Sequence, residues 1–479
     1  MGTRAAAFFD LDRTLLKGAS GPVFTAALRD AGVIPDRTIP GEKALYRVFD
    51  LFGENLLSMG LTRQAARVAT GWSADAVREA CTQAAKVLSG EVAPYARQLM
   101  DEHRAAGRSV VLATTSPFDM VKPLADELGL DDVIATTYGR DSEGRYDGTI
   151  VGSFVWGTGK LDAVRAWADA HDVSLQESWA YSDSVFDVPL LSAVGHPTAV
   201  NADAQLGVIA RARRWPVIRL DAPPGVPKVL GVEPWSALRP FMSPLAFPYA
   251  RFDIGGVEHI PAEGPGIVVA NHRSYFDTVA VGLTVAPSGR PLRFLGKKEV
   301  FDAPIVGQLA RAMGGIRVDR GTGSDEPLRQ AARALDAGEL VAMMPQGTIP
   351  RGRAFFEPEL RGRWGAARLA RMTGAPLIPL GLWGTERVWP RSSRLPNVAQ
   401  VVSPPLVRTR VGQPFHVDGE DLDDDTRRIM DAIVDLLPPE AKVRREPTRE
   451  ELLRTLPPGF KGDPEAYGEE QHRPGRDRA

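Results

Sequence analysis

Apolar and polar positions alternate in blocks along the first 220 or so residues. Short apolar runs stand at AAAFF (5–9), SVVLA (109–113) and SWAYS (178–182), and between them apolar residues recur at helical spacing. Short runs bounded by polar residues favour buried strands, and the periodic stretches favour helices. Alternating strands and helices predict an α/β domain with a Rossmann-like parallel sheet. In such a domain, functional residues lie at the carboxyl ends of the strands.

One stretch of this region lacks strand signals. From about residue 15 to about residue 95 the pattern is helical, as in AVREACTQAAKVL (76–88). A helical block directly after the first strand predicts a helical cap inserted into the sheet domain. Its most apolar part, YRVFDLFGENLLSMG (46–60), is either core of the cap or a surface for a lipid-like phosphate monoester.

A second α/β region follows a break in the pattern. DAPPGVPK (221–228) contains three prolines and a glycine, which is typical of a linker. The region ends on a helix at 423–437 that begins with acids and is stopped by Pro438. Beyond it the chain is charged, proline-rich and aperiodic, which predicts an unstructured tail. We therefore expect domains at 1–222 and 223–440, followed by a tail at 441–479.

Composition narrows the class of protein. A chain of 479 residues exceeds what one hydrophobic core serves. The net charge of -2 gives no electrostatic case for nucleic acid, and the single Cys81 fits a reducing compartment. No window reaches eighteen uninterrupted apolar residues, and the N-terminus does not read as a signal peptide. We expect a cytoplasmic protein that touches a membrane only peripherally, at its inner face.

Six polar side chains of the first region stand at predicted strand ends or at a helix start: Asp10, Asp12, Thr114, Lys160, Asp183 and Asp187. Asp10 and Asp12 lie two apart on an extended segment, so both carboxylates can face one ligand. Singly, each residue has a structural explanation: a capping acid, a strand-end hydroxyl or a solvated lysine. Together, in this order, they suit phosphoryl transfer. Carboxylates approach a phosphate only when a hard cation neutralises them, which indicates Mg²⁺.

This set resembles the haloacid dehalogenase superfamily of phosphatases, in the helical-cap branch that includes phosphoserine phosphatases, over about residues 5–205. The resemblance implies that Asp10 forms an aspartyl-phosphate and that Asp12 protonates the leaving group and then activates water. Thr114 and Lys160 would hold the transferring phosphoryl group. The Mg²⁺ ligands that the resemblance implies are Asp10, Asp12 (backbone carbonyl), Asp183 and Asp187.

A second candidate site lies in IVVANHRSYFD (267–277), where an apolar run ends at His272. If Ser274 caps a helix, Asp277 is the third helical residue and completes a capping box. That interpretation leaves His272 unexplained. On one continuous helix the side chains of His272 and Asp277 would lie about 140° apart. They meet only if His272 precedes the helix and folds back, so that Asp277 holds one ring nitrogen and leaves the other as a base.

Three further blocks follow in order: GGIRVDR (314–320), PQGT (345–348) and APLIPL (375–380). With NHRSYFD they resemble the glycerolipid acyltransferase family, which includes the 1-acylglycerol-3-phosphate acyltransferases, over about residues 255–390. The resemblance implies an α/β domain that transfers a fatty acyl group from acyl-CoA, or from an acyl carrier protein thioester, to the free hydroxyl of a lysophospholipid. His272 would remove the hydroxyl proton, and Asp277 would orient His272 and stabilise the imidazolium.

The resemblance also implies an anion site. Arg320 would bind the phosphate of the acceptor, unless it only forms a surface ion pair. The family usually has glutamate followed by Gly-Thr-Arg, whereas this chain has Gln346, Gly347, Thr348 and Ile349. Arg351 is the candidate replacement for the missing arginine, and the backbone N–H groups of Gly347 and Thr348 could bind an anion. The departure leaves the acceptor open.

Alternatives of other classes remain at this point. The first domain could be a regulatory or binding module beside an acyltransferase, or the second could be a lipid-binding anchor for a phosphatase. Membrane contact is suggested by PWSALRPFMSPLAFPYARF (234–252), which mixes large apolar residues with Arg239 and Arg251. The same segment could instead pack on the acyltransferase core. Basic residues such as Arg293 could add attraction to anionic lipid.

Overall fold

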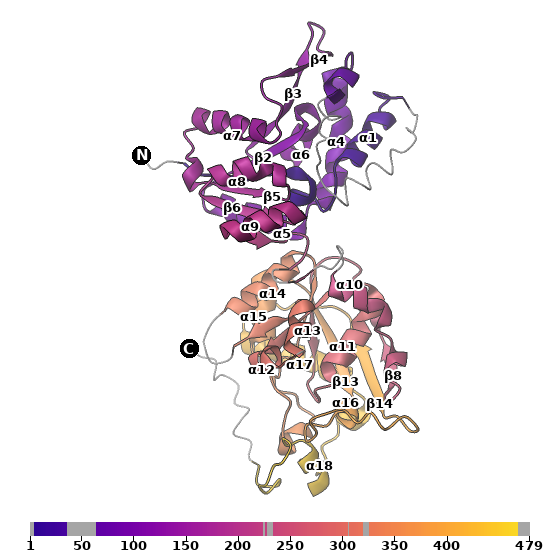
Figure 1. Ribbon diagram of the computed structural model, residues 1–479. Helices are drawn as coiled ribbons and strands as arrows, with labels where there is room; N and C mark the ends of the chain where they lie inside the picture. Colours follow the sequence, from indigo (N-terminus) through magenta and orange to yellow (C-terminus); the bar gives the residue numbers. More distant parts are fainter. Residues whose placement is uncertain are drawn as a thin grey trace. The chain divides into compact units, whose positions relative to one another are not determined.

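The computed structural model describes residues 4–35, 64–223, 226–227, 233–304, 306–319 and 325–467. The chain divides into two compact units, 1–224 and 225–479. Each unit is built around a seven-stranded sheet with helices packed against it (Figure 1). The division falls inside the proline-rich segment at 221–228.

The first sheet has the strand order β4-β3-β2-β1-β5-β6-β7, and only the β3–β4 pairing is antiparallel. Its strands are β1 (Ala6–Phe9), β2 (Ser109–Pro117), β3 (Asp132–Arg140), β4 (Tyr146–Val151), β5 (Trp179–Ser182), β6 (His196–Val200) and β7 (Val217–Ile218). β1 lies at the centre of the sheet and is buried along its whole length, as expected for a parallel strand covered on both faces. The predicted parallel α/β sheet is confirmed.

The helices of the first unit are α1 (Gly21–Asp30), α4 (Ala74–Glu91), α5 (Pro94–Ala105), α6 (Phe118–Glu127), α7 (Thr158–Ala170), α8 (Val188–Ala193) and α9 (Ala204–Arg213). α4 packs against α1 and α6, and Ser73 caps α4 by accepting a hydrogen bond from Ala76 N. α1 and α4 both fall within the predicted cap at 15–95. The apolar stretch 46–60 lies outside the described residues.

The second sheet has the order β11-β10-β12-β9-β13-β14-β8, with β14 antiparallel to β13. Its strands are β8 (Arg251–Gly255), β9 (Gly266–Ala270), β10 (Leu292–Lys297), β11 (Ile316–Val318), β12 (Leu340–Met343), β13 (Leu377–Trp383) and β14 (Leu406–Val411). Along β9, Val268 and Ala270 join one core cluster, whereas Ile267 and Val269 join another. Both faces of this strand are therefore covered, which explains why the run before His272 is apolar throughout.

The helices of the second unit are α10 (Pro234–Leu238), α11 (Asp277–Val285), α12 (Lys298–Asp302), α13 (Val306–Ala312), α14 (Glu326–Asp336), α15 (Gly365–Thr373), α16 (Thr385–Val388), α17 (Leu422–Asp435) and α18 (Arg449–Arg454). α17 begins at the cap Asp421, which accepts hydrogen bonds from Asp423 N and Asp424 N. The expected closing helix is thus present. Arg293, expected as a surface charge, is instead buried and pairs with Glu339 and Glu233.

The prediction of an unstructured tail is wrong for residues 441–467. Within this segment, α18 begins with a capping box in which Thr448 and Glu451 each accept a hydrogen bond from the other's backbone N–H. Leu452 and Leu456 are buried, and Thr455 Oγ1 accepts a hydrogen bond from Gly352 N at 2.8 Å. The composition of the segment is polar, but a cap and two apolar contacts suffice to dock one short helix.

Candidate active sites

The carboxyl ends of the central strands of the first sheet carry the predicted acidic residues. Asp10 directly follows β1 and Asp183 directly follows β5. Because β1 and β5 are parallel neighbours, these ends meet at one edge, and Asp10 N donates to Tyr181 O at 3.0 Å. Thr114 lies in the neighbouring strand β2, buried, and accepts from Ser116 N at 3.3 Å. β2 continues three residues past the predicted strand end at Thr114, to Pro117.

Lys160 ties two of the predicted carboxylates together. It is the third residue of α7 and only 1% exposed. Its ammonium donates to Asp10 Oδ1 at 2.8 Å and to Asp187 Oδ2 at 2.7 Å, and Ser182 Oγ also donates to Asp187 Oδ2 at 2.7 Å. A buried lysine needs such partners, so the interpretation as a solvated surface lysine is wrong.

Arg13 was not among the predicted residues, yet its side chain enters the site. Its Nε lies 3.2 Å from Asp183 Oδ2. The backbone at Arg13 is left-handed, with φ 57°, and Asn201 Nδ2 donates to Arg13 O at 2.8 Å. Asp12, the preceding residue, accepts from Ser20 N at 2.7 Å. The only sequence signal was the position of an arginine directly after two aspartates.

The donor chemistry of this cluster fits a hard cation. Asp187 Oδ1 is buried and has no hydrogen-bond partner, and the remaining candidate donors are carboxylate or carbonyl oxygens. Among the residues that the structure describes, however, no group of three or more Asp, Glu, His or Cys side chains is arranged to hold a metal ion. Asp183 turns toward Arg13 instead. The oxygens therefore suit Mg²⁺ by type, while Asp183 contacts an arginine.

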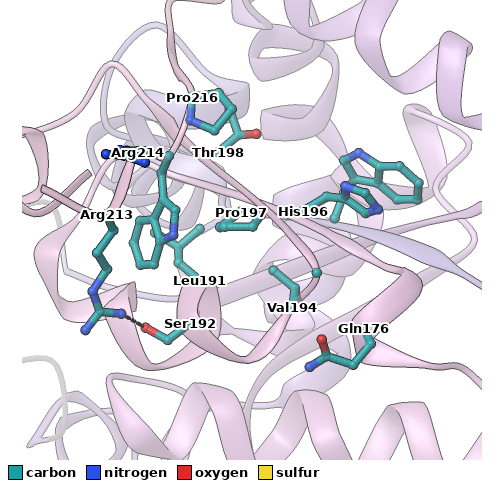
Figure 2. Close-up of a pocket in the computed structure, with 13 residues that line it drawn as sticks. Gln176, Leu191, Ser192, Val194, His196, Pro197, Thr198, Arg213, Arg214 and Pro216 are labelled. Atoms are coloured by element: carbon teal, nitrogen blue, oxygen red, sulfur yellow. Dashed lines mark hydrogen bonds between the residues drawn. The ribbon is translucent and has the colours of Figure 1, made fainter. Parts of the chain in front are cut away.

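A hollow of about 540 Å³ in the same unit lies away from these residues (Figure 2). It is bordered by Trp179 and His196, which begin β5 and β6, and by Arg213, which donates to Ser192. The amino ends of the strands are opposite to the edge that carries Asp10 and Asp183. This hollow contains none of the predicted catalytic groups.

In the second unit, the side chains of His272 and Asp277 meet as the angular argument requires. His272 lies between β9 and α11, and Asp277 is the first residue of α11. The ring Nδ1 of His272 lies 2.7 Å from Asp277 Oδ2. Asp277 is fully buried, and no described residue hydrogen-bonds the Nε2 of His272. The pair thus leaves one ring nitrogen open to a ligand.

The capping box predicted for Ser274 is half formed. Asp277 Oδ2 accepts from Ser274 N at 2.8 Å and from Arg273 N at 2.6 Å. Ser274 Oγ does not accept from Asp277 N; it accepts from Phe276 N at 2.9 Å and donates to Trp389 O at 2.6 Å. One carboxylate therefore caps the helix and orients the histidine.

The Gln-Gly-Thr block contacts the backbone of His272. Gln346 is buried, and its Oε1 accepts from His272 N at 2.6 Å. Gly347 N donates to Met344 O at 2.8 Å within a turn. This N–H group, expected to bind an anion, therefore already has a partner within the protein. Arg351 Nη1 donates to the Tyr467 hydroxyl at 2.8 Å. Arg320 lies outside the described residues.

Arg273, which was not among the predicted residues, directly follows His272. Its guanidinium lies 4.1 Å from the centre of the Trp383 ring and 4.3 Å from that of Phe355, and Nε donates to Glu386 Oε2 at 3.1 Å. Two aromatic faces and a carboxylate hold this side chain rigidly. They fix the wall of the site next to His272.

Comparison with known proteins defines each unit. Residues 7–192 match the family model described as haloacid dehalogenase-like hydrolase, and residues 251–383 match the model described as acyltransferase. "Inhibition of morphological differentiation protein" of Streptomyces azureus is 34% identical over 222 residues, which span 46% of this chain and 80% of that protein. "Phosphoserine phosphatase SerB1" of Mycobacterium tuberculosis (strain ATCC 25618 / H37Rv) is 33% identical over 236 residues, which span 48% and 76%.

One solved structure with partial similarity to this chain is an acyltransferase. The 1-acyl-sn-glycerophosphate acyltransferase PlsC from Thermotoga maritima is 22% identical, with a TM-score of 0.33, over 44% of this chain and 81% of that chain. The two family models indicate an enzyme with a hydrolase domain and an acyltransferase domain in one chain. The chain belongs to the haloacid dehalogenase-like hydrolases.

Proposed function

We propose that the protein is a bifunctional enzyme of phospholipid metabolism. Its second domain would transfer a fatty acyl group from acyl-CoA or an acyl carrier protein thioester to the free hydroxyl of a lysophospholipid such as 1-acylglycerol-3-phosphate. Its first domain would be a Mg²⁺-dependent phosphomonoesterase. The observation that carries the proposal is the 2.7 Å contact between His272 Nδ1 and Asp277 Oδ2, with Nε2 left open.

Acyl transfer would begin at the open nitrogen of His272. Nε2 removes the proton of the acceptor hydroxyl as its oxygen attacks the thioester carbonyl carbon. The tetrahedral adduct then collapses, the C–S bond breaks, and the thiolate takes the proton back from Nε2. Asp277 holds the other ring nitrogen through both steps and stabilises the transient imidazolium.

Gln346 would position His272 by binding its backbone N–H group. Its Oε1 fixes the backbone N–H of His272 at 2.6 Å, a bond that glutamate could also accept. We therefore infer a positioning role for Gln346 in addition to the predicted role in substrate binding. The proposed ligands of the acceptor phosphate are Thr348, Arg351 and Arg320.

Phosphate monoester hydrolysis would use the edge of the first sheet. The carboxylate of Asp10 attacks phosphorus while Asp12 donates a proton to the leaving oxygen, and Asp12 later takes a proton from the water that hydrolyses the aspartyl-phosphate. Lys160, anchored at 2.8 Å to Asp10, and Thr114 would hold the phosphoryl oxygens. A Mg²⁺ ion held by Asp10, Asp12 O, Asp183 and Asp187 would neutralise the carboxylates.

Contact with the inner face of a membrane fits the surface near α10. Phe241 is 75% exposed and Leu245 is 90% exposed, whereas Trp235 is buried in the core, so the segment 234–252 both packs and presents apolar side chains. Of the helices described, none is long and apolar enough to cross a bilayer. Replacement of Phe241 and Leu245 by serine should weaken sedimentation with anionic vesicles, and unchanged sedimentation would contradict this contact.

The acyltransferase proposal is tested with acyl-CoA and lysophosphatidate. His272→Ala should lower kcat about 10²–10⁴-fold, because the base is lost. The exposed His171→Ala in the other domain is the matched control and should leave the rate unchanged. Acyl transfer that survives His272→Ala would remove His272 as the base, and no transfer to any lysolipid would favour a lipid-binding anchor.

The phosphatase proposal is tested with an aryl phosphate. Asp10→Asn should abolish hydrolysis, because an amide is not a competent nucleophile at phosphorus. The exposed Asp169→Asn on α7 serves as the control. Hydrolysis that is indifferent to Asp10→Asn, or absent in the unmodified protein, would favour a regulatory or binding module.

A further inference from the structure

Arg391 is a buried cation without a counter-charge. Its side chain belongs to a residue that is only 8% exposed, and its Nε is buried without a hydrogen-bond partner. Within the described part of the chain, no carboxylate pairs with its guanidinium. A buried charge without a counter-charge is unfavourable, so an anionic ligand bound at Arg391 would stabilise the folded protein.

One further cation and two phenols act on the charge of Arg391. They are Arg351, Tyr275 and Tyr467. Burial lowers the pKa of the Arg391 guanidinium, and the positive charge of Arg351 lowers it further. The guanidinium of Arg391 lies 6.0 Å from the centre of the Tyr275 ring. Two guanidinium groups and two phenols form a basic, hydrogen-bond-rich surround that suits a phosphate.

The segments that carry Arg351 and Arg391 contact the turn around His272. Ser274, two residues after His272, donates to Trp389 O at 2.6 Å, and the rings of Tyr275 and Trp389 lie 5.6 Å apart. Arg391 follows Trp389 by two residues. Arg351 follows the block whose Gln346 accepts from His272 N. Short contacts therefore link the segments that carry the two arginines to the turn that carries His272.

The C-terminal segment contacts the loops that carry Arg351 and Arg391. Arg351 Nη1 donates to the Tyr467 hydroxyl at 2.8 Å, Gly352 N donates to Thr455 Oγ1 at 2.8 Å, and Ser392 N donates to Arg454 O at 3.2 Å. Gly352 has φ 57°, and a Cβ there would come within 3.3 Å of Tyr467 O. Arg454, Thr455 and Tyr467 thus contact both arginine-bearing loops.

We propose that Arg351 and Arg391, flanked by Tyr275 and Tyr467, form a phosphate-binding site that receives the headgroup phosphate of the lysolipid acceptor. This inference rests on the proposed acyl transfer, which it deepens by naming the acceptor class as a lysophospholipid with an accessible phosphate. A monoester phosphate carries nearly two negative charges near neutral pH and so matches two cations. The phosphates of acyl-CoA share this chemistry and are the competing source.

The kinetic test separates the two sources. With lysophosphatidate as acceptor, Arg391→Gln should raise the KM for the acceptor at least about tenfold, the loss of one charge-assisted contact, and leave the KM for acyl-CoA unchanged. Monoacylglycerol, which lacks the phosphate, should be acylated equally by both forms. The exposed Arg394→Gln in the same loop is the matched control. A raised KM for acyl-CoA alone, or an equal loss with monoacylglycerol, would overturn the proposal.

A binding measurement keeps the inference independent of turnover. In the full-length protein, inorganic phosphate should raise the Tm of the second unit, and Arg391→Gln and the less buried Arg351→Gln should each remove most of that rise. The Arg394→Gln protein should respond like the unmodified one. If no lysolipid is acylated but this phosphate response is present and depends on Arg391, the proposed function fails while the site stands. A phosphate response that persists in both variants would overturn the site.

Discussion

Asp277 does several tasks with a single oxygen. Its Oδ2 receives the His272 ring and the backbone N–H groups of Arg273 and Ser274, while Oδ1 is buried with no partner. These short, charge-assisted contacts fix the carboxylate on the turn before α11. The turn could be predicted because a histidine and an aspartate five positions apart cannot meet on a continuous helix. The third donor, Arg273 N, could not, because spacing alone gives no information about backbone orientation.

The sequence predicted most residues of the acidic cluster but not the arginine that contacts it. The order of acids, hydroxyl and lysine along the strands was enough to expect that Asp10, Lys160 and Asp187 would meet, because parallel strands end at one edge. Arg13 and Arg391 were missed for a physical reason. Arginines are usually surface residues, and nothing in the local pattern marks one that packing has buried.

His103 gives the first unit a dependence on pH. Burial, and then the charge of Arg108, lowers the pKa of His103 from about 6.5 to about 4, and its Nε2 lies 2.8 Å from the Tyr181 hydroxyl. Between these two pH values the unfolded chain binds a proton that the folded chain does not, so stability falls as the pH falls from 7 toward 4. We expect a loss of about 2 kcal/mol between pH 7 and pH 5.

Urea unfolding of the full chain at both pH values measures this loss. His103→Gln should flatten the dependence of the first unit on pH, because glutamine has no proton to exchange in this range. The exposed His171→Gln should retain the slope of the unmodified protein. Equal slopes in all three proteins would show that another group is responsible.

At the scale of elements, the C-terminal segment shows where composition misleads. Its charge and prolines predict no core, and it builds none of its own. The segment is held by the capping box at Thr448 and by burial of Leu452 and Leu456 within the second unit. The strands and long helices were predicted because they carry a periodic pattern, whereas a helix of six residues is too short to show one.

The capping box gives this element a direct test. Thr448→Ala should destabilise α18 by about 1 kcal/mol, because the N–H of Glu451 loses its acceptor. Amide hydrogen exchange over residues 449–456 should then accelerate roughly fivefold, as that free energy implies. Thr448→Ser retains the hydroxyl and should exchange like the unmodified protein. Unchanged exchange in the alanine variant would show that Leu452 and Leu456 alone hold the helix.

At the scale of the molecule, the proposed function assigns the two sheets two chemistries with different needs. The proposed phosphatase site would need a cation beside its carboxylates, whereas the proposed acyltransferase site would use the His272–Asp277 pair, 2.7 Å apart, without a metal. Removal of divalent cations with EDTA should therefore abolish aryl phosphate hydrolysis and leave acyl transfer within about twofold. Restoration of hydrolysis by Mg²⁺ completes the measurement. Loss of both activities with EDTA would contradict the proposed division of labour.

The placement of β14 has a consequence for anyone who isolates the second domain. The match to the acyltransferase model ends at residue 383, which is the last residue of β13, and β14 covers the edge of β13 and also pairs with β8. A fragment that stopped there would expose an open strand edge made of LIPLGLW, almost wholly apolar. Such an edge recruits strands from other chains. A domain cut at the family boundary is therefore expected to aggregate before its chemistry can be assayed.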